Sequence, residues 1–346
     1  MADEARAFWV VAPGRGEIRS EGLRSPEAGE VVVQTLFSGI SRGTEALVFA
    51  GHVPQSEWVR MRAPFQDGEF SGSVKYGYAS VGRVECGPNE LIGKTVFVLY
   101  PHQTRYVAPA SAVHVLPADV PPARAILAAN LETAVNGVWD ASPRTGDRVV
   151  VIGAGTVGCL VAWLASRIEG CDVQLVDVNP RRQHIAQALG VSFARPESAM
   201  VDADIVIHVS GSPEGLQRAL DIAGFEATII EMSWFGDRQV SLTLGAAFHS
   251  RRLTIKSSQV GHVAPSQRAR WDTRRRMAHA LSLLANPVLD VLITGEDSFD
   301  DLPEVMARLT QSPGDALCHR IKYQLESLDV QCDRSRSRDD RAQLQR

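Results

Sequence analysis

The sequence predicts an α/β protein in which a doubly wound parallel sheet is joined to a second, β-rich domain. Three observations support this fold class. Residues 1–118 contain short β-branched and aromatic runs that are separated by Gly and Pro. Residues 119–323 alternate apolar strand-like runs with helical stretches, which is typical of parallel sheets. A glycine-rich segment, residues 153–158, lies between the first of these strands and a helix.

Chain length and composition are consistent with a folded protein of about two domains. The chain has 346 residues, of which 45% are hydrophobic and 22% are charged, so apolar side chains suffice for a core. With 36 basic and 40 acidic residues the formal charge is −4, which argues against a general nucleic-acid-binding protein. The five cysteines contain no C-x-x-C pair, and a cysteine-rich structural zinc lobe is therefore not predicted.

The β-rich part is predicted from its residue types. Residues 30–37 and 93–100 are rich in Val, Thr, Phe and other strand-forming residues. Residues 80–85 alternate in character and are followed by the turn-forming pair Gly87-Pro88. We therefore expect a strand at each of these three places.

The second part begins with a helix that is expected over residues 123–141, after Pro121-Pro122. The strands that follow are expected at 149–152, 173–176, 205–209 and 228–232, and the helices between them at 157–166, 181–189 and 214–223. Further along, we expect a helix at 270–284, a strand at 289–294, a helix at 302–311 and a strand at 317–323. Residues 324–346 are rich in charge and poor in apolar side chains, which predicts a disordered tail.

One stretch needs a separate explanation, because residues 149–166 contain no charged side chain and approach the length of a membrane span. The stretch contains three glycines, however, and a strand, a turn and a helix explain it better. The N-terminal residues also lack an apolar signal core. We therefore expect a cytoplasmic protein without a membrane contact.

Residues 149–158 match the G-x-G-x-x-G pattern of dinucleotide-binding turns, in the strand–turn–helix context that the pattern requires. Gly153 permits the tight turn, Gly155 lets the backbone approach a pyrophosphate, and Gly158 lets the helix pack closely on the strand. Thr156 and Val157 complete the motif at the helix N-terminus, where free N–H groups attract an anion. We therefore expect these five residues to bind a dinucleotide.

The choice of dinucleotide depends on the end of the second strand. Asp177 lies 19 residues after Gly158, where a carboxylate receives the adenosine ribose hydroxyls and repels a 2′-phosphate. NAD is therefore the expected cofactor, although Arg181 and Arg182 could instead accept the phosphate of NADP. Ser210 follows another strand and is expected beside the nicotinamide; an ordinary strand-end turn is the alternative.

The order of these elements resembles the medium-chain dehydrogenase/reductase superfamily, which includes the zinc alcohol dehydrogenases. The resemblance covers about residues 1–323. It implies that residues 1–118 and 286–323 form a GroES-like catalytic domain, and that residues 119–285 form a Rossmann dinucleotide-binding domain. Residues 324–346 form a tail outside both.

The zinc ligands of that superfamily fall on residues that bind zinc poorly. The first ligand, a cysteine, falls on Ser41; the second, a histidine, falls on Tyr78; and the third, a cysteine or glutamate, falls on Glu132. Serine and neutral tyrosine are poor substitutes for thiolate and imidazole, and no cysteine is expected in this pocket. The resemblance therefore implies a zinc-independent member without metal ligands.

Within the superfamily, the segments at residues 38–45 and 77–78 are most similar to the 2-desacetyl-2-hydroxyethyl bacteriochlorophyllide a dehydrogenase subgroup. Members of that subgroup oxidise a secondary alcohol on a chlorin ring. The similarity implies a secondary alcohol on a larger ring system as one class of substrate.

Without zinc, a hydrogen-bond donor must polarise the substrate oxygen. Tyr78 is the first candidate, and Lys75 could lower the pKa of its phenol; a core aromatic is the alternative reading of this residue. Glu132 could act as a base or orient a hydroxyl, or it could be a solvated or capping carboxylate. Ser41 and Thr44 could relay protons or cap turns.

Two basic positions and one cluster complete the candidates. Arg42 falls where the alcohol dehydrogenases place a pyrophosphate-binding residue. His102, on a loop after a strand, could relay protons, although a surface histidine is the simpler expectation. A run of arginines could bind an anion, but a solvated helix face is expected for Arg268, Arg270, Arg274, Arg275 and Arg276.

The leading hypothesis is a zinc-independent, NAD(P)-dependent oxidoreductase that interconverts an alcohol and a carbonyl. An enone or quinone reductase is the second hypothesis, and a non-catalytic dinucleotide-binding or sensor protein is the third. For the leading hypothesis we expect a small-molecule substrate, no nucleic-acid partner and a homodimer.

Overall fold

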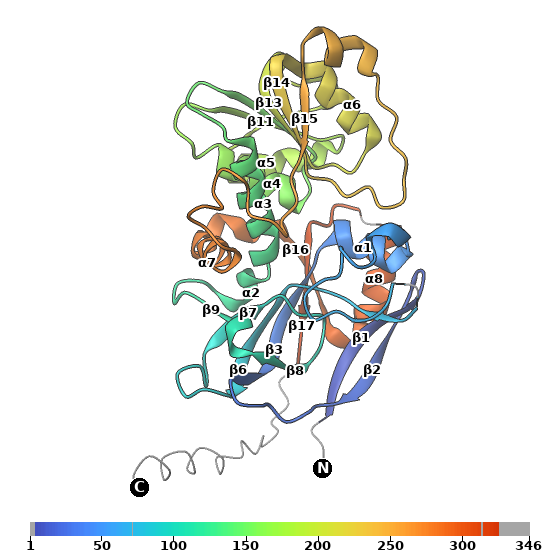
Figure 1. The fold of residues 1–346 in the computed structure, drawn as a ribbon, viewed down its shortest axis with the longest axis vertical. Coiled ribbons are helices and arrows are strands. Elements are labelled where there is room, and N and C mark those ends of the chain that lie inside the picture. The colour runs from blue at the N-terminus through green and yellow to red at the C-terminus, as the bar shows by residue number, and fades with distance from the viewer. Residues whose placement is uncertain (1–3, 71, 313, 325–346) are drawn as a thin grey trace.

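The fold has two lobes, which lie one above the other in Figure 1. A computed structural model describes residues 4–70, 72–312 and 314–324; the predicted tail therefore lies almost entirely outside the described residues. The upper lobe contains a parallel sheet and its helices, and the lower lobe contains the N-terminal strands together with strands from the C-terminal part.

The upper lobe is built on a six-stranded sheet with the order β12-β11-β10-β13-β14-β15, and every neighbouring pair is parallel. The order reverses beside β10, which places a topological switch point at its carboxyl end. The strands are β10 (Arg148–Ile152), β11 (Asp172–Val176), β12 (Ser192–Ala194), β13 (Ala203–His208), β14 (Ala223–Glu231) and β15 (Thr254–Ser257).

Both faces of this sheet are covered by other parts of the lobe. Residues 149–152 of the central strand β10 are all apolar, and side chains of such a run are buried on both faces of a parallel sheet. Val149 and Val151 of β10 join a buried cluster with the helices on one face, while Val150 and Ile152 join a cluster with α6 on the other. The helices of this lobe are α3 (Ala128–Ala141), α4 (Thr156–Ala165), α5 (Gln183–Leu189), α6 (Pro213–Ile222) and α7 (Thr273–Leu283). The short helix α2 (Pro122–Ala125) precedes α3 and lies against the lower lobe (Figure 1).

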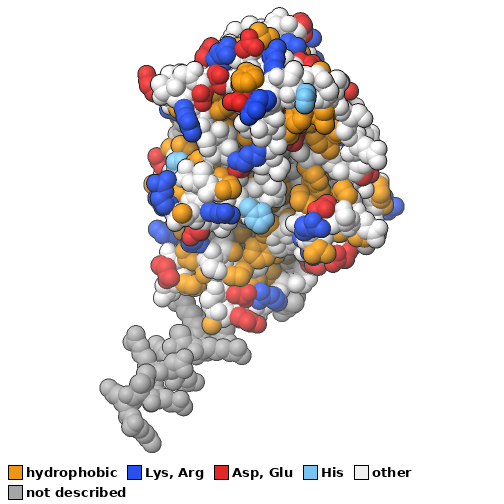
Figure 2. Space-filling model, turned by 45° about the horizontal axis from the view of Figure 1, so that its top comes forward, with side chains coloured by type: hydrophobic (Ala, Val, Ile, Leu, Met, Phe, Trp, Pro, Cys, Tyr) orange, Lys and Arg blue, Asp and Glu red, His pale blue; other side chains and the backbone are white. Residues whose placement is uncertain are grey.

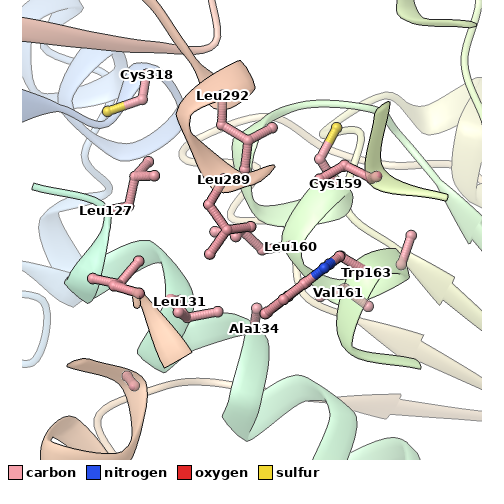
Figure 3. Close-up of a cluster of buried hydrophobic side chains, with 14 of the residues drawn as sticks. Leu127, Leu131, Ala134, Cys159, Leu160, Val161, Trp163, Leu289, Leu292 and Cys318 are labelled. Atoms are coloured by element: carbon pink, nitrogen blue, oxygen red, sulfur yellow. The ribbon is translucent and has the colours of Figure 1, made fainter. Parts of the chain in front are cut away.

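The largest buried cluster joins α3, α4 and the C-terminal segment. Figure 3 shows Leu131 of α3, Leu160 and Trp163 of α4, and Leu289 in contact range within one apolar core. Burial of such side chains contributes roughly 1.5–3 kcal/mol each, so this cluster fixes α4 and the turn before it against the sheet.

The lower lobe contains a seven-stranded sheet with the order β16-β17-β3-β6-β7-β9, in which β8 also pairs with β3, and a four-stranded sheet with the order β2-β1-β5-β4. Its elements are β1 (Glu4–Ala12), β2 (Arg15–Gly22), β3 (Glu30–Ile40), α1 (Arg42–Ala50), β4 (Asp67–Gly68), β5 (Val74–Lys75), β6 (Ser80–Cys86), β7 (Thr95–Val98), β8 (Arg105–Pro109), β9 (His114–Val115), β16 (Ile293–Ser298), α8 (Leu302–Gln311) and β17 (Cys318–Lys322). Antiparallel pairing of β17 with β3 joins the end of the chain to its beginning.

The structure differs from the sequence-based elements at four places. The strand expected at 289–294 is wrong, because a 3-10 helix spans Pro287–Leu292 and the strand β16 follows it. The helix expected over 123–141 is interrupted between α2 and α3. Helix α7 begins at Thr273, later than expected, because Asp272 caps it by accepting the Arg275 N–H at 2.7 Å. Helix α1 was not predicted.

The uncharged stretch at residues 149–166 forms β10, the glycine turn and α4, as predicted. None of the helices in the described part of the chain has the length and apolar character of a membrane span.

Candidate active site

The glycine turn has a geometry that permits only glycine at two of its positions. Gly153 has a φ of +109°, and a Cβ built there would lie 2.7 Å from Cα of Ser210. A Cβ on Gly158 would overlap the carbonyl oxygen of Gly153. A Cβ on Gly155, in contrast, would meet no atom within 4 Å. Gly155 therefore faces open space, while Gly153 and Gly158 form the close contact of turn, strand and helix.

The Asp177 carboxylate lies against this turn. Its Oδ2 accepts the N–H of Ala154 at 2.6 Å, and its Oδ1 accepts the N–H of Asn179 at 2.8 Å. The side chain is thus held at the carboxyl end of β11, beside the backbone of the glycine turn. Thr156 and Val157 begin α4 immediately after Gly155.

Two guanidinium groups meet at the junction of the lobes. Arg42 donates to the carbonyl oxygen of Ala316 at 3.1 Å, and the buried Arg182 donates to the carbonyl oxygens of Asp315 at 2.8 Å and Ala316 at 3.4 Å. Burial lowers the pKa of Arg42, the charge of Arg182 lowers it further, and Asp177 raises it. The three charged groups are therefore close enough to act on one another.

The structure gives Arg182 and its neighbour different surroundings. Arg182 donates hydrogen bonds to the carbonyl oxygens of residues 315 and 316, in the segment before β17. Arg181, in contrast, is exposed and pairs with the Asp315 carboxylate at 2.8 Å. Asp315 also accepts a hydrogen bond from the side-chain amide of Asn179 at 2.7 Å. The segment before β17 therefore closes this end of the nucleotide-binding lobe.

A cluster of hydroxyl groups surrounds Tyr78 at the start of α1. The hydroxyls of Ser41 and Thr44 lie close enough to the phenol to lower its pKa. Burial raises the pKa of Tyr78 above its ordinary value of 10.0, the Glu45 carboxylate raises it further, and the two hydroxyls lower it. The phenol is therefore protonated at neutral pH and can donate a hydrogen bond to a substrate oxygen.

The predicted effect of Lys75 is wrong. Its ammonium group lies 2.7 Å from a carboxylate oxygen of Glu21, and it also contacts the ring of Trp9. The pKa of Tyr78 is raised rather than lowered. A lysine three residues away in an extended segment does not share the face of the phenol, because successive side chains alternate.

His102 is buried with only 1% of its surface exposed, so the expectation of a surface histidine is wrong. Its Nε2 lies 2.8 Å from Oε2 of Glu45, and its Nδ1 lies 2.6 Å from the hydroxyl of Ser38. The Ser38 hydroxyl lies 2.9 Å from the hydroxyl of Tyr323, which follows β17. A buried chain of four polar side chains thus leads from Glu45 through the sheet.

Glu45 connects this chain to the hydroxyl cluster. Its second oxygen, Oε1, accepts the N–H of Ser41 at 2.8 Å, so Glu45 caps α1. Its charge acts on Tyr78, Tyr323 and the thiol of Cys318. Glu45 was not predicted as a functional residue. Its position four residues after Ser41, where the superfamily has its first zinc ligand, was a signal that could have found it.

Cys318 corrects the expectation that no cysteine is near this pocket. It lies fully buried at the start of β17 and acts on the Tyr78 phenol. Burial raises the pKa of Cys318 to about 12, so the group is a neutral thiol.

Glu132 is a buried member of an ion pair, and neither a solvated nor a capping carboxylate. Its Oε1 lies 3.0 Å from Nε of Arg276, and both side chains are nearly inaccessible to solvent. Burial raises the pKa of Glu132, while Arg276 lowers it. Arg276 also donates to Oδ1 of Asn136 at 2.6 Å. The solvated helix face was therefore wrong for Arg276 and holds for Arg274 and Arg275. Arg268 and Arg270 are exposed as well, but they precede the helix.

A second polar group that the sequence analysis missed lies at the carboxyl ends of β13 and β14. His208 is fully buried, and its Nδ1 lies 2.7 Å from Oε2 of Glu231, its register partner on the next strand. Its Nε2 lies 2.6 Å from the hydroxyl of Ser210. The signal was an ionisable residue at the last position of each strand, directly after an apolar run.

The structure therefore brings Ser41, Thr44 and Tyr78 together, with Glu45 and His102 behind them. Glu132 has a different partner, Arg276. The surface is hollowed between the two lobes, and hydrophobic side chains line part of the hollow (Figure 2). The site can bind an anion at the glycine turn and donate hydrogen bonds from neutral hydroxyls.

Sequence comparison gives relatives along most of the chain. The chain is similar to D-guloside 3-dehydrogenase of Escherichia coli, with 25% identity over 317 residues that cover 80% of this chain and 88% of that protein. It is also similar to galactitol 1-phosphate 5-dehydrogenase of Escherichia coli, with 22% identity over 223 residues, which cover 59% of this chain and 62% of that protein. No model of a protein family matches the sequence.

Solved structures share the whole fold. L-idonate 5-dehydrogenase of Escherichia coli matches with a TM-score of 0.76 and 16% identity, covering 93% of this chain and 99% of that one. A short chain alcohol dehydrogenase of Escherichia coli in complex with NADH matches with a TM-score of 0.72 and 15% identity, covering 92% and 99%.

The fold is thus that of the alcohol dehydrogenases, with a Rossmann-type sheet and a separate β-rich lobe. The comparisons support the medium-chain dehydrogenase/reductase superfamily, and the chain is an alcohol dehydrogenase-like enzyme. The non-catalytic alternative is accordingly set aside. The bacteriochlorophyllide dehydrogenase subgroup stays a prediction.

The Glu132–Arg276 pair gives a test of stability. Arg276→Met leaves a buried carboxylate without its partner, and we expect the free energy of unfolding at pH 7 to fall by about 3–5 kcal/mol. The loss should shrink as the pH falls, because protonation of Glu132 removes the unpaired charge.

Chemical denaturation at several pH values measures this effect. The control is Arg270→Met, at an exposed position just before the same helix, which should change stability by no more than about 0.5 kcal/mol. Equal and small effects of both substitutions would contradict a structural role for the pair.

Proposed function

We propose that the protein is an NAD(P)-dependent oxidoreductase that interconverts an alcohol and a carbonyl without zinc. The observation that carries the proposal is the neutral Tyr78 phenol, which lies beside the hydroxyls of Ser41 and Thr44 at the superfamily's metal position, in a chain that also has the dinucleotide-binding turn. A neutral phenol can polarise a carbonyl oxygen by donating a hydrogen bond, which is the task that a metal ion performs in related enzymes.

The dinucleotide would be held at the glycine turn. Its pyrophosphate would lie beside Gly155, where the backbone is open, and at the N-terminus of α4. The Asp177 carboxylate would receive ribose hydroxyls and favours NAD over NADP. Arg42 stays the proposed pyrophosphate contact, and Arg182 is close enough to assist it. When bound, the nicotinamide supplies the hydride donor or acceptor.

The residues at the superfamily's metal position do not fit zinc. Ser41 and Tyr78 offer neutral hydroxyl oxygens, the neighbouring Cys318 is a neutral thiol, and Glu132 is paired with Arg276. Zinc sites use thiolate, imidazole and carboxylate ligands. Among the described residues, no group of three or more His, Cys, Asp and Glu side chains could hold a metal ion.

In the reduction direction, the Tyr78 phenol donates to the carbonyl oxygen as negative charge develops there. In the oxidation direction, a proton must leave the alcohol. The Glu45 carboxylate and the His102 imidazole, 2.8 Å apart behind the phenol, are the titratable groups that can accept it. Ser41 and Thr44 would carry it from the phenol toward this pair.

The substrate class follows from the relatives. They are named for dehydrogenation of sugar-derived compounds, and one name places the reaction at carbon 3 of a guloside. A secondary alcohol, including one carried on a ring, is therefore the proposed substrate, and the second lobe would position it against the nicotinamide. A panel that includes ring-borne secondary alcohols, polyols and enones separates this proposal from an enone reductase.

The glycine turn provides a matched pair of variants. Gly158→Ala should lower the free energy of unfolding by about 1–3 kcal/mol, because the new methyl group overlaps the Gly153 carbonyl. Gly155→Ala should leave stability almost unchanged, because its methyl group enters open space, but it should weaken NADH binding. Thermal denaturation and NADH fluorescence titration measure the two effects. An unaltered NADH affinity in Gly155→Ala would contradict the assigned position of the pyrophosphate.

Removal of the phenol hydroxyl tests the chemistry. Tyr78→Phe should lower kcat by roughly 10²–10⁴-fold, the usual size of an acid–base contribution, while the affinity for NADH stays nearly constant. Tyr106→Phe is the control, since this phenol is also buried but bonds to Ser80. Nicotinamide absorbance measures turnover. Normal turnover of Tyr78→Phe would remove the residue from the mechanism.

Metal analysis tests zinc independence. Protein purified without added metal should contain well under one zinc ion per chain and should keep its activity after dialysis against a chelator, because Ser41 and Tyr78 are poor ligands. Elemental analysis and the activity assay are the measurements. Stoichiometric zinc, or loss of activity that zinc restores, would contradict the assignment.

A further inference from the structure

Three side chains at the carboxyl edge of the parallel sheet form a continuous hydrogen-bonded unit. Glu231 Oε2 lies 2.7 Å from Nδ1 of His208, and Nε2 of His208 lies 2.6 Å from the hydroxyl of Ser210. His208 is fully buried, Glu231 is partly buried and Ser210 is exposed. The unit therefore connects a partly buried carboxylate, through a fully buried imidazole, to one hydroxyl on the surface.

Backbone groups fix each end of the unit. The other oxygen of Glu231 accepts the N–H of Ser233 at 2.6 Å, and the Ser210 hydroxyl accepts the N–H of Ser212 at 3.1 Å. The Ser233 hydroxyl lies 3.3 Å from Nδ1 of His208. These contacts leave little rotational freedom to the carboxylate or to the serine hydroxyl.

Charged, aromatic and backbone groups surround His208. The Glu231 carboxylate contacts it directly, and the Phe235 ring stacks on it at 6.2 Å. The N-terminus of α6 faces Nε2, since a Cβ on Gly215 would lie 2.9 Å from that atom. Arg238 donates to the carbonyl oxygen of Gly211 at 2.8 Å, and Glu214 lies in the first turn of α6.

The neutral imidazole has only one arrangement of hydrogens in this setting. The ionised Glu231 carboxylate can only accept, so Nδ1 carries the hydrogen. Nε2 must then accept the hydrogen of the Ser210 hydroxyl. As a result, the Ser210 oxygen presents an acceptor lone pair to its surroundings and no hydrogen. Protonation of His208 would reverse this, since Nε2 would donate and the Ser210 hydrogen would turn outward.

The Ser210 oxygen lies where a dinucleotide would pass. The Cα and N atoms of Ser210 are the closest atoms to a Cβ built on Gly153, the first glycine of the turn. Carboxyl ends of the strands at a topological switch point are the place where ligands bind in such sheets.

We propose that Glu231 and His208 are positioning residues that make Ser210 a hydrogen-bond acceptor for a hydroxyl or amide donor of the bound dinucleotide, and that protonation of His208 weakens this binding. The inference rests on the proposed function, because it needs a nicotinamide dinucleotide at the turn. It adds His208 and Glu231 to the cofactor site and gives Ser210 a defined acceptor role there.

The key variant is Glu231→Gln, in which the amide can donate to Nδ1 and so move the imidazole hydrogen to Nε2. Ser210 then turns its own hydrogen outward. NADH titrations from pH 5 to pH 9 should show wild-type affinity that falls on acidification. Glu231→Gln should bind NADH roughly tenfold more weakly at pH 8, about the effect of one unmade hydrogen bond, with little dependence on pH.

Two control variants separate this effect from general damage. His249→Gln, at an exposed histidine of the same lobe, should keep the wild-type affinity and pH profile. Ser210→Ala should weaken NADH binding, and Glu231→Gln added to Ser210→Ala should cause no further loss, because both act through the same hydroxyl.

Nitrogen-15 NMR of histidine-labelled protein gives an independent measure that needs no ligand. The His208 signals, assigned by their loss in His208→Gln, should show a neutral ring with the hydrogen on Nδ1 at pH 8. A hydrogen on Nε2, or Glu231→Gln with the wild-type affinity and pH profile, would overturn this inference alone. A wild-type protein that binds neither NADH nor NADPH would overturn the proposed function as well.

Discussion

The close contact of Gly153, Gly158 and Ser210 is the constraint on which the nucleotide-binding lobe depends. Because no side chain separates these backbones, the turn, helix α4 and the end of β13 meet at one point. The same contact places Asp177 against the turn and Ser210 at its edge. Any larger residue would move α4 away from β10, and with it the N–H groups that attract an anion.

Buried carboxylates organise the rest of the molecule. Glu45 is paired with His102, Glu132 with Arg276 and Glu231 with His208. A buried charge is strongly unfavourable without a partner, so each pair joins elements that are distant in the sequence. The Glu45 pair supports α1 and the Tyr78 phenol, the Glu132 pair joins α3 to α7, and the Glu231 pair joins β13 to β14. Polar pairing therefore determines where reactive groups can lie.

Sequence patterns predicted what depends on local geometry. The glycine turn, Asp177 and the alternation of strands and helices all follow from spacing and periodicity, and the hydroxyls at Ser41, Thr44 and Tyr78 follow from the family resemblance. Partners across long distances could not be read in this way: 57 residues separate His102 from Glu45, and 144 separate Arg276 from Glu132. A histidine after a strand looks exposed until the tertiary fold supplies its partner. The 3-10 helix at Pro287–Leu292 was missed because a short apolar run fits a strand equally well.

The protonation state of Tyr78 limits the mechanisms that this site can support. Burial and Glu45 keep the phenol neutral, so it can donate to a carbonyl but cannot take a proton from an alcohol. Reduction has to supply a proton to the product oxygen and oxidation has to remove one from the alcohol, so both directions need a proton-carrying group behind the phenol. The Glu45–His102 pair, whose side chains lie 2.8 Å apart behind the phenol, is the candidate for this group. Because the forward and reverse reactions follow the same path, the group that accepts the proton during oxidation must return it during reduction, and both directions depend on the same buried chain.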